Sequence, residues 1–240
     1  MQTYSVKLKE KVEIADQTWA FIFEKPETFL FEAGQYVVMT LPELKFPDER
    51  RGIRSLSIAS APYEDTLMFA MRITSSGFKK TLMEMNAGEN VTITQAFGHF
   101  TLPASDTVSP IVFLIGGIGI TPARSILRQA AHMQSKQPFQ LFYSNRAPKD
   151  TAFAQELQSI AGLENYRCID TMTNYQDVCE WSEESGYICR EMIEKYPMSQ
   201  NEHPYYFLVG APLFIKAMED MLHEMGVSDE HMKKDPFTGI

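Results

Sequence analysis

A glycine-rich turn lies between an apolar run and an amphipathic helical pattern in the stretch LIGGIGITPARSILR, Leu114–Arg128. Glycines let a phosphate group approach the backbone closely, and the start of a helix offers unpaired N–H groups with partial positive charge. The residues of this candidate anion site are Gly116, Gly117, Gly119, Thr121 and Pro122. The spacing G-G-x-G-x-T-P differs from the strict dinucleotide fingerprint, so a purely steric turn is the alternative interpretation.

A second candidate anion site begins with the run RSLSIAS, which opens with Arg54. In an extended strand, Arg54 and Leu56 point to one face, while Ser55 and Ser57 point to the other. An arginine inside a barrel strand needs an anion as its partner. The alternative is a solvated edge strand that carries an ordinary surface arginine.

A strand pattern also ends in Ser-Ser-Gly within the run RITSSGFKKTLMEM, and a helical turn begins there. The backbone N–H groups of such a turn, at Ser76, Gly77 and Phe78, can hold a phosphate. The alternative is an ordinary helix N-cap.

The composition is that of a globular protein and excludes several classes. The chain has 240 residues, 44% of them hydrophobic, and a net charge of -9, which argues against nucleic-acid binding. No basic-plus-apolar leader is visible and no apolar run approaches the roughly 20 residues that span a bilayer, so we expect a cytoplasmic protein without an integral membrane segment. Cys168, Cys179 and Cys189 have the spacing of neither an iron–sulfur loop nor a zinc pair, so we expect free, buried thiols and no metal site.

The elements that position these residues change character near the middle of the chain. Up to about residue 103, short alternating runs separated by turn residues predict an antiparallel β-barrel over residues 1–104. The proline- and serine-rich segment Leu102–Pro110 then marks a boundary. Beyond it, continuous apolar strands alternate with helical patterns, which predicts an α/β doubly wound parallel sheet over residues 109–240.

Taken in order, the motifs RSLS, SSGFKKTL, GHFTL, GGIGITPARSIL, LFYSNRAPKDTAFAQEL, YYFLVGAP and FTGI resemble those of the ferredoxin–NADP reductase superfamily of flavoproteins. The resemblance covers essentially the whole chain and corresponds to the two-domain form without a fused ferredoxin module. It implies a Greek-key, flavin-binding barrel followed by a nucleotide-binding α/β domain. The implied cofactors are FAD and NADPH, with NADH as the other possibility.

The resemblance assigns roles to residues of the first domain. Arg54 resembles the arginine that binds the flavin pyrophosphate, and Ser57 the hydroxyl that faces flavin N5. Leu56 stands where many members carry a flavin-stacking aromatic residue. The further residues implied in flavin binding are Ser55, Ser76, Gly77, Phe78 and Thr81.

In the second domain, the glycine turn with Thr121 and Pro122 resembles the cradle for the nicotinamide side of NAD(P)H. Ser144 and Arg146 match the positions that meet the adenosine ribose. An arginine there can pair with a 2′-phosphate, which favours NADPH, but it can also stack on adenine.

The end of the chain departs from the family pattern in part. Gly210 and Pro212 of VGAP match the family, whereas Val209 replaces its cysteine. Asp235 and Phe237 resemble the acid and the aromatic residue near the end of some bacterial members, as a proton relay and a cover over the flavin. A frayed tail is the alternative.

The implied activity is hydride transfer from NAD(P)H to flavin N5, followed by release of electrons to a separate acceptor such as ferredoxin or flavodoxin. Alternatives are a flavin or ferric-chelate reductase with a diffusible acceptor, a cytochrome-b5-reductase-like role, and a non-catalytic electron-transfer or regulatory subunit that retains the fold. An acidic acceptor protein needs a basic patch for docking. Such a patch is available from Lys79, Lys80, Lys233 and Lys234, unless these are ordinary surface lysines.

Overall fold

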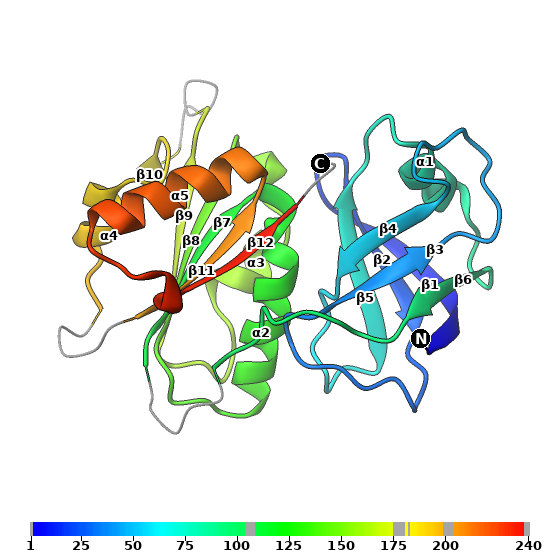
Figure 1. Ribbon diagram of the computed structural model, residues 1–240, viewed down its shortest axis with the longest axis horizontal. Coiled ribbons are helices and arrows are strands. Elements are labelled where there is room, and N and C mark those ends of the chain that lie inside the picture. Colours follow the sequence, from blue (N-terminus) through cyan, green and yellow to red (C-terminus); the bar gives the residue numbers. More distant parts are fainter. Residues whose placement is uncertain (1, 104–108, 175–180, 182, 199–203, 238–240) are drawn as a thin grey trace. The chain divides into compact units, whose positions relative to one another are not determined.

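The computed structural model describes residues 2–103, 109–174, 181, 183–198 and 204–237 (Figure 1). Contacts divide the chain into two compact units. The first unit consists of residues 1–102 and 121–129, and the second of residues 103–120 and 130–240. Most of the expected boundary segment, residues 104–108, lies outside the described residues.

The first unit is built on a six-stranded antiparallel sheet with the order β4-β3-β6-β1-β2-β5. Its strands are β1 (Thr3–Ala15), β2 (Thr18–Glu24), β3 (Tyr36–Thr40), β4 (Ile53–Ser57), β5 (Thr66–Arg72) and β6 (Asn90–Thr94). The long strand β1 pairs with β6 through its first residues and with β2 from Leu8 onward. The Ala59 N–H donates to Met68 O at 2.8 Å, so the segment after β4 is joined to β5 at the other edge of the sheet. This confirms the expected antiparallel barrel.

One helix, α1 (Gly77–Glu84), packs on the core of this barrel. Alternating apolar residues of the strands, such as Phe21, Phe23 and Phe69, are fully buried in that core. Phe78 and Leu82 of α1 join them. Because a strand turns successive side chains to opposite faces, this alternation is what places a polar residue such as Arg54 away from the core.

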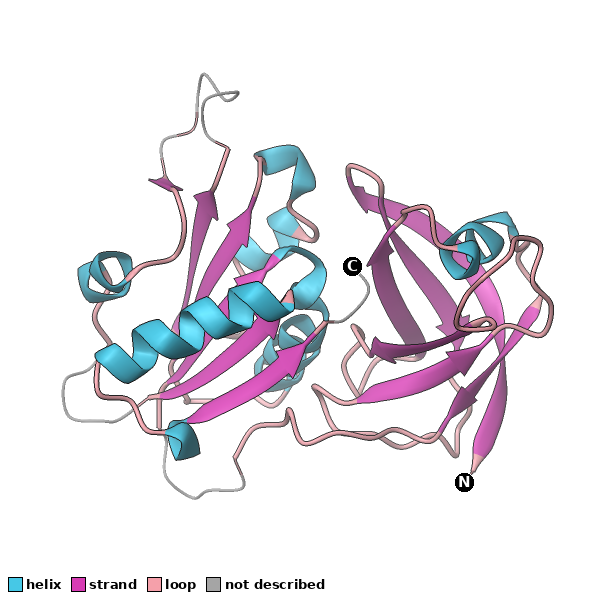
Figure 2. Cartoon of the chain, turned by 45° about the horizontal axis from the view of Figure 1, so that its top comes forward, coloured by secondary structure: helices cyan, strands magenta, loops and turns pink. Residues whose placement is uncertain are grey.

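The second unit is a six-stranded sheet with the order β10-β9-β8-β7-β11-β12, in which every pairing is parallel (Figure 2). Its strands are β7 (Ile111–Gly116), β8 (Phe139–Asn145), β9 (Tyr166–Met172), β10 (Glu184–Ser185), β11 (Tyr205–Gly210) and β12 (Met232–Pro236). Its helical elements are η1 (Gly117–Gly119), α2 (Ile120–His132), η2 (Pro148–Asp150), α3 (Ala154–Gln158), α4 (Arg190–Lys195), α5 (Pro212–Glu224) and η4 (Asp229–His231).

Helices cover both faces of this sheet, as expected for a doubly wound fold. Apolar side chains of α4 and α5 form one core cluster with Ile169 of β9 and neighbouring strand residues. The next residue, Asp170, points to the opposite face and accepts a hydrogen bond from Gln158 of α3. The central strand β7 is buried from Ile111 to Ile115, which explains its continuous apolar sequence.

Residues 121–129, the larger part of α2, cluster with the first unit. Arg124 is buried there and donates from Nη1 to Ala59 O at 2.7 Å, and Ser125 Oγ donates to Ser60 O at 2.7 Å. The amphipathic pattern predicted this helix, but it gave no sign that Arg124 and Ser125 hold backbone carbonyl groups that follow β4. In the described part of the chain, no helix combines the length and the apolar character that crossing a bilayer requires.

Candidate functional site

Arg54, on β4, lies at the centre of a polar cluster in the first unit. Its guanidinium group binds both carboxylate oxygens of Asp48, with Nη2–Oδ1 at 2.5 Å and Nη1–Oδ2 at 2.9 Å. Nη2 also donates to Ser76 Oγ at 3.1 Å, and the guanidinium carbon lies 5.2 Å from the centre of the Phe78 ring. We name the donor set formed by Arg54, Ser76 and the Phe78 N–H the Arg54 cradle.

The Asp48 carboxylate is the anion in this cradle. It accepts backbone N–H groups from Gly52 at 3.0 Å and Phe78 at 3.2 Å, and it lies 3.4 Å from Ser76 Oγ. Its side chain is only 2% exposed, against 16% for Arg54. The hydrogen bonds from Arg54 hold the pKa of Asp48 well below its usual range. A carboxylate held by this many donors stays ionised.

Asp48 also replaces a local cap at the start of α1. Ser76 stands at the N-cap, but its side chain makes no capping hydrogen bond. The first N–H groups of a helix have no partner within the helix, and negative charge is favourable beside them. The Phe78 N–H finds this partner in Asp48, which comes from a distant loop.

The loop that carries Asp48 is seated closely against α1. A Cβ atom at Gly77 would lie 2.1 Å from Pro47 O, so this position accepts only glycine while the loop is seated. Thr81, which is buried, accepts the Lys45 N–H through Oγ1 at 3.1 Å. The structure thus brings Ser76, Gly77, Phe78 and Thr81 to Arg54, as the motif order predicts.

The other strand residues of the first candidate site have different surroundings. Ser57 is buried at the end of β4, opposite Tyr36 of β3. Ser55 is exposed, and Leu56 is half-buried against the barrel core. The structure therefore places Arg54 and Ser57 at opposite ends of one short strand.

The second candidate site lies where β7 and β11 are neighbours in the parallel sheet. The chain leaves β7 toward β8 on one side and leaves β11 toward β12 on the other, so this is the topological switch point of the sheet. Ligands of open α/β sheets bind at the carboxyl ends of the strands at this point. Gly116 ends β7 and Gly210 ends β11.

These glycines keep the switch point free of side chains. A Cβ atom at Gly210 would lie 2.8 Å from Phe214 Cδ1 and 3.5 Å from the Gly116 Cα. At Gly119, a Cβ atom would meet Val209 O at 2.9 Å. Gly117 has a positive φ of 53°, and nothing lies within 4 Å of the position of its Cβ. Steric need therefore explains Gly119 and Gly210, whereas the open space at Gly117 is available to a ligand.

Two helix starts frame this turn. Pro122 and the buried Thr121 lie in the first turn of α2, and Pro212 opens α5 directly after Ala211. The N-cap residue of α5, Ala211, has no side-chain hydroxyl or carboxylate to satisfy the first N–H groups. An anion at this edge would take that role.

Ser144 and Arg146 follow at the end of β8. Ser144 is buried and pairs with Gly116 of β7 across the sheet. The Arg146 side chain is 66% exposed, and its Nη2 lies 3.6 Å from Asp150 Oδ1. Such an exposed pair at (i, i+4) is weak. Arg146 is therefore held loosely at the edge where the glycine turn lies.

The end of the chain is an ordered strand as far as it is described. Asp235 lies in β12 opposite Val209, and the Phe237 N–H donates to Gly210 O at 2.8 Å. The alternative of a frayed tail is therefore wrong for residues 232–237, and residues 238–240 lie outside the described residues. The structure brings Phe237 to the strand end that carries Gly210.

The four lysines expected to form a docking patch differ in their surroundings. Lys79 is buried, which contradicts its assignment to a surface patch, whereas Lys80 is exposed. Burial lowers the pKa of Lys79, as do the nearby charges of Arg54 and Arg72. The Lys233 ammonium lies 5.7 Å from the centre of the Phe207 ring.

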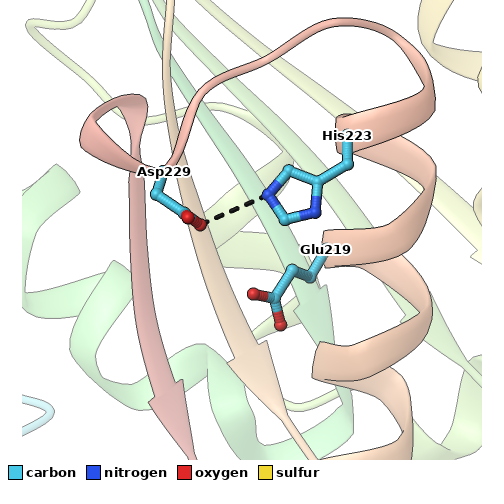
Figure 3. Close-up of side chains that lie close together, drawn as sticks. All are labelled: Glu219, His223 and Asp229. Carbon is cyan, nitrogen blue, oxygen red and sulfur yellow. Dashed lines mark hydrogen bonds and ion pairs between the residues drawn. The ribbon is translucent and has the colours of Figure 1, made fainter.

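Lys234 belongs to a charged cluster on α5 and η4. Among the described residues, the ligand atoms of Glu219, His223 and Asp229 lie within 4.8 Å of one another, and Figure 3 shows these side chains pointing together. The Lys234 ammonium is 2.7 Å from Glu219 Oε1 and 3.8 Å from Asp229 Oδ1. This ammonium already supplies the cation, so we interpret the group as an ion-pair cluster.

A second buried carboxylate, Asp170, is paired with neutral groups within the described part of the chain. It accepts hydrogen bonds from Gln158 Nε2 at 2.5 Å and from Cys168 Sγ at 3.8 Å. Burial raises the pKa of Asp170 to about 6 and raises that of the Cys168 thiol well above its usual range. Cys168 and Cys189 are free thiols, but Cys189 is exposed, so its expected burial is wrong; Cys179 lies outside the described residues.

Asp48 and Phe214 are the site residues that the sequence reasoning missed. Asp48 sits in a charged turn, FPDERRG, and no strand or helix period relates it to Arg54. Phe214 fits the apolar stripe of α5, which concealed its contact with the two glycines. The proline and glycine that bracket the turn are the available signal for a loop with a defined conformation.

Similarity to known proteins agrees with these arrangements. Residues 113–220 match the family described as oxidoreductase NAD-binding domain. One subunit of the Na(+)-translocating NADH-quinone reductase of Shewanella denitrificans is 28% identical over 202 residues, which are 78% of this chain and 49% of that protein. The corresponding protein of Pasteurella multocida is 28% identical over 203 residues, with the same two shares of 78% and 49%. The chain thus spans about half the length of these curated relatives.

Solved structures share the fold across nearly the whole chain. A ferredoxin NADP+ reductase from Neisseria gonorrhoeae, with bound FAD and NADP, has a TM-score of 0.82 at 21% identity and covers 98% of this chain and 99% of its own. The FAD/NAD binding domain of a nitric oxide dioxygenase from Vibrio cholerae has a TM-score of 0.81 at 17% identity, with 99% of both chains covered.

Proposed function

We propose that this chain, which has the fold of the ferredoxin–NADP reductase superfamily and an oxidoreductase NAD-binding domain, is an FAD-dependent NAD(P)H oxidoreductase. The observation that carries the proposal is that each unit contains its own site for an oxyanion. The first is the Arg54 cradle, and the second is the glycine turn at the switch point. An enzyme that uses two dinucleotides needs two such sites, because each cofactor brings a pyrophosphate.

The Arg54 cradle has the donors that a flavin pyrophosphate requires. A carboxylate oxygen already accepts from Arg54 Nη2 at 2.5 Å and from the Phe78 N–H at 3.2 Å, so Asp48 acts as a stand-in for a phosphate oxygen. Arginine and helix N-termini are common partners of phosphate groups. We infer that Arg54, Ser76 and Phe78 hold the pyrophosphate of FAD.

The glycine turn fits the pyrophosphate of a nicotinamide dinucleotide. Gly117 opens onto free space, and Gly119 and Gly210 keep Cβ atoms away from the strand ends. Backbone N–H groups at the start of α5 lack a side-chain cap and point to this edge. Within this proposal, Thr121 and Pro122 shape the start of α2, and Pro212 shapes that of α5.

Bound flavin would accept a hydride and release electrons singly, which is chemistry that amino-acid side chains do not supply. The task of the protein is to bind, orient and shield. Ser57, buried at the end of β4, is our proposed hydrogen-bond donor to flavin N5. Asp235 and Phe237 remain our proposed proton relay and flavin cover, since β12 holds them beside Gly210.

For the donor, we favour NADPH on the strength of Arg146, whose exposed guanidinium group follows β8 at the ribose position. The names of the curated relatives specify NADH, so NADH is the other candidate. For the acceptor, we propose a separate protein such as ferredoxin or flavodoxin. Quinone-linked membrane complexes, which the relatives' names indicate, are a second class of partner. Electron release to free flavin or to a ferric chelate is the main alternative activity, and a non-catalytic role within a larger complex is the other.

The decisive experiment is an anaerobic titration of the FAD-loaded protein with NADPH and, separately, NADH, followed by the visible flavin spectrum. We expect rapid bleaching by at least one of the two nucleotides. A protein that takes up no FAD would contradict the flavoprotein assignment. A flavoprotein that neither nucleotide bleaches would favour the non-catalytic role. Ferredoxin, flavodoxin, quinone, free flavin and ferric chelate, supplied in turn to the reduced protein, then identify the acceptor class.

A further inference from the structure

The donors of the Arg54 cradle are engaged by a residue of the same chain. Both Nη atoms of Arg54 bind Asp48, and the Phe78 N–H and Ser76 Oγ point to the same carboxylate. A flavin pyrophosphate would need these donors. The carboxylate and the pyrophosphate therefore cannot occupy the cradle together, because both are anions that require the same few donor groups.

The local charge favours a stronger anion than one carboxylate. Lys79 is buried beside the cradle, and its pKa is lowered first by burial and then by the charges of Arg54 and Arg72. A lowered lysine pKa means that positive charge is in excess there. Asp48 contributes a single negative charge, whereas a pyrophosphate in a dinucleotide contributes two. The same cradle thus fits the pyrophosphate better, once Asp48 has left.

The loop that carries Asp48 is held mainly by contacts near the cradle. Its own backbone hydrogen bonds, from Arg51 N–H to Asp48 O and from Ile53 N–H to Arg50 O, are local and can move with it. Arg51 has a positive φ of 51°, an unfavourable conformation for a residue other than glycine. The neighbouring residues Glu49 and Arg50 are exposed. Displacing Asp48 therefore breaks few contacts outside the cradle.

We propose that Asp48 is a resident anion that competes with the flavin pyrophosphate for the Arg54 cradle, so that FAD binds only when the loop of Asp48 swings out. This proposal rests on the proposed function. It makes the flavin of this protein exchangeable, because Asp48 returns to the cradle whenever FAD leaves. Riboflavin, which has no phosphate, does not meet this competition.

The test compares flavin affinities of the flavin-free protein for FAD and for riboflavin, measured by quenching of flavin fluorescence. Asp48→Asn removes the competing charge and keeps the shape of the side chain. We expect it to tighten FAD binding by about tenfold and to leave riboflavin binding unchanged. Glu49→Gln is the matched control, because it removes one carboxylate from the next, exposed position of the same loop, and it should change neither affinity.

The opposite result would overturn the proposal. If Asp48→Asn weakens FAD binding, Asp48 serves to position Arg54 for the pyrophosphate and does not compete with it. If FAD affinity is unchanged while the protein still binds flavin and is reduced by NAD(P)H, the proposed function stands and the competition is refuted. If neither wild type nor variant binds any flavin, both proposals fail.

A measurement on the wild-type protein keeps the proposal testable even if Asp48→Asn does not fold. Hydrogen exchange of the Gly52 and Phe78 amides reports whether Asp48 is seated, because both N–H groups donate to it. FAD should speed exchange at Gly52 while the pyrophosphate protects Phe78, and riboflavin should alter neither. Slower exchange at both amides with FAD would show that Asp48 stays in the cradle, against the proposal.

Discussion

The Arg54 cradle of the first unit and the glycine turn of the second unit use different kinds of donor for the same kind of anion. The cradle depends on one guanidinium group, and a carboxylate 2.5 Å away already satisfies it. The turn depends on backbone N–H groups, and at Gly117 nothing lies within 4 Å of where a Cβ atom would be. A side-chain cation can be neutralised by the chain itself, whereas an open backbone turn stays available to a ligand.

The two units also bury a carboxylate in different ways. Asp48 is buried with its cation, and the hydrogen bonds from Arg54 hold its pKa well below the usual range. Asp170 is buried with the neutral donors Gln158 and Cys168, and burial raises its pKa to about 6. One carboxylate is thus stabilised as an ion and the other is destabilised as an ion, which makes their responses to mutation and pH differ in sign.

Removal of the cation from the cradle should have the largest effect. Arg54→Ala leaves Asp48 buried with only neutral donors, and we expect the free energy of unfolding to fall by about 3 to 4 kcal/mol at pH 7. The double variant Arg54→Ala/Asp48→Asn should recover part of this loss, because no charge then stays buried. Urea denaturation of both variants measures the difference. Equal stabilities of the single and double variants would show that Asp48 reaches water once Arg54 is gone.

The Asp170 carboxyl should make the second unit less stable as pH rises. Its pKa in the fold lies above the ordinary value of 3.8 for an aspartate, so the fold favours the protonated form. Its contribution is fully present below pH 4 and is lost as pH rises through about 6. The shift limits the loss to about 3 kcal/mol.

Asp170→Asn isolates this effect from the remaining charges of the chain. Across pH 4 to 8, the difference in unfolding free energy between variant and wild type should grow in favour of the variant. Parallel stability curves would mean that Asp170 is solvated in solution. The same substitution should leave flavin affinity unchanged, since Asp170 belongs to the second unit.

A methyl group at the glycine turn should affect the nucleotide and spare the flavin. In Gly119→Ala, the new Cβ meets Val209 O at 2.9 Å, so the turn must shift away from β11. We expect NAD(P)H to bind about tenfold or more weakly, because the N–H groups no longer line up with the phosphate. Gly226→Ala, which adds a Cβ with nothing within 4 Å at the other end of α5, is the control. Equal nucleotide affinities of the two variants would refute this role of the turn.

The smallest effect is expected at the edge of the second site. Arg146→Ala should lower the preference for NADPH over NADH by about tenfold, because one charge-assisted contact to the 2′-phosphate is lost. Its pair with Asp150 is exposed, so stability should change by less than about 1 kcal/mol. Lys149→Ala removes the same charge from an exposed neighbouring position and should not change the ratio. A ratio that is the same in all three proteins would exclude Arg146 from nucleotide selection.

Much of the fold could be predicted because its signals are local. The apolar run of β7, the alternation of β2 and the proline that opens α5 each follow from neighbouring residues. The edge strand β12 was not predicted, because its sequence MKKDP has no apolar pattern and it forms only by pairing with β11. The helix expected over residues 150–161 is shorter, α3 at Ala154–Gln158, since η2 and a residue of left-handed conformation, Phe153, precede it.

The sequence by itself determined where the glycines, the arginine and the strand ends fall, and thus which residues are available to hold two anions. Only the tertiary structure decided which anion is present in the first site, because Asp48 meets Arg54, Ser76 and Phe78 through a turn that no periodicity describes. It also decided that Lys79 is buried and that Phe214 packs against both strand-end glycines. The physical reason is that charge pairing and close packing act between segments distant in the chain, where sequence spacing carries no information.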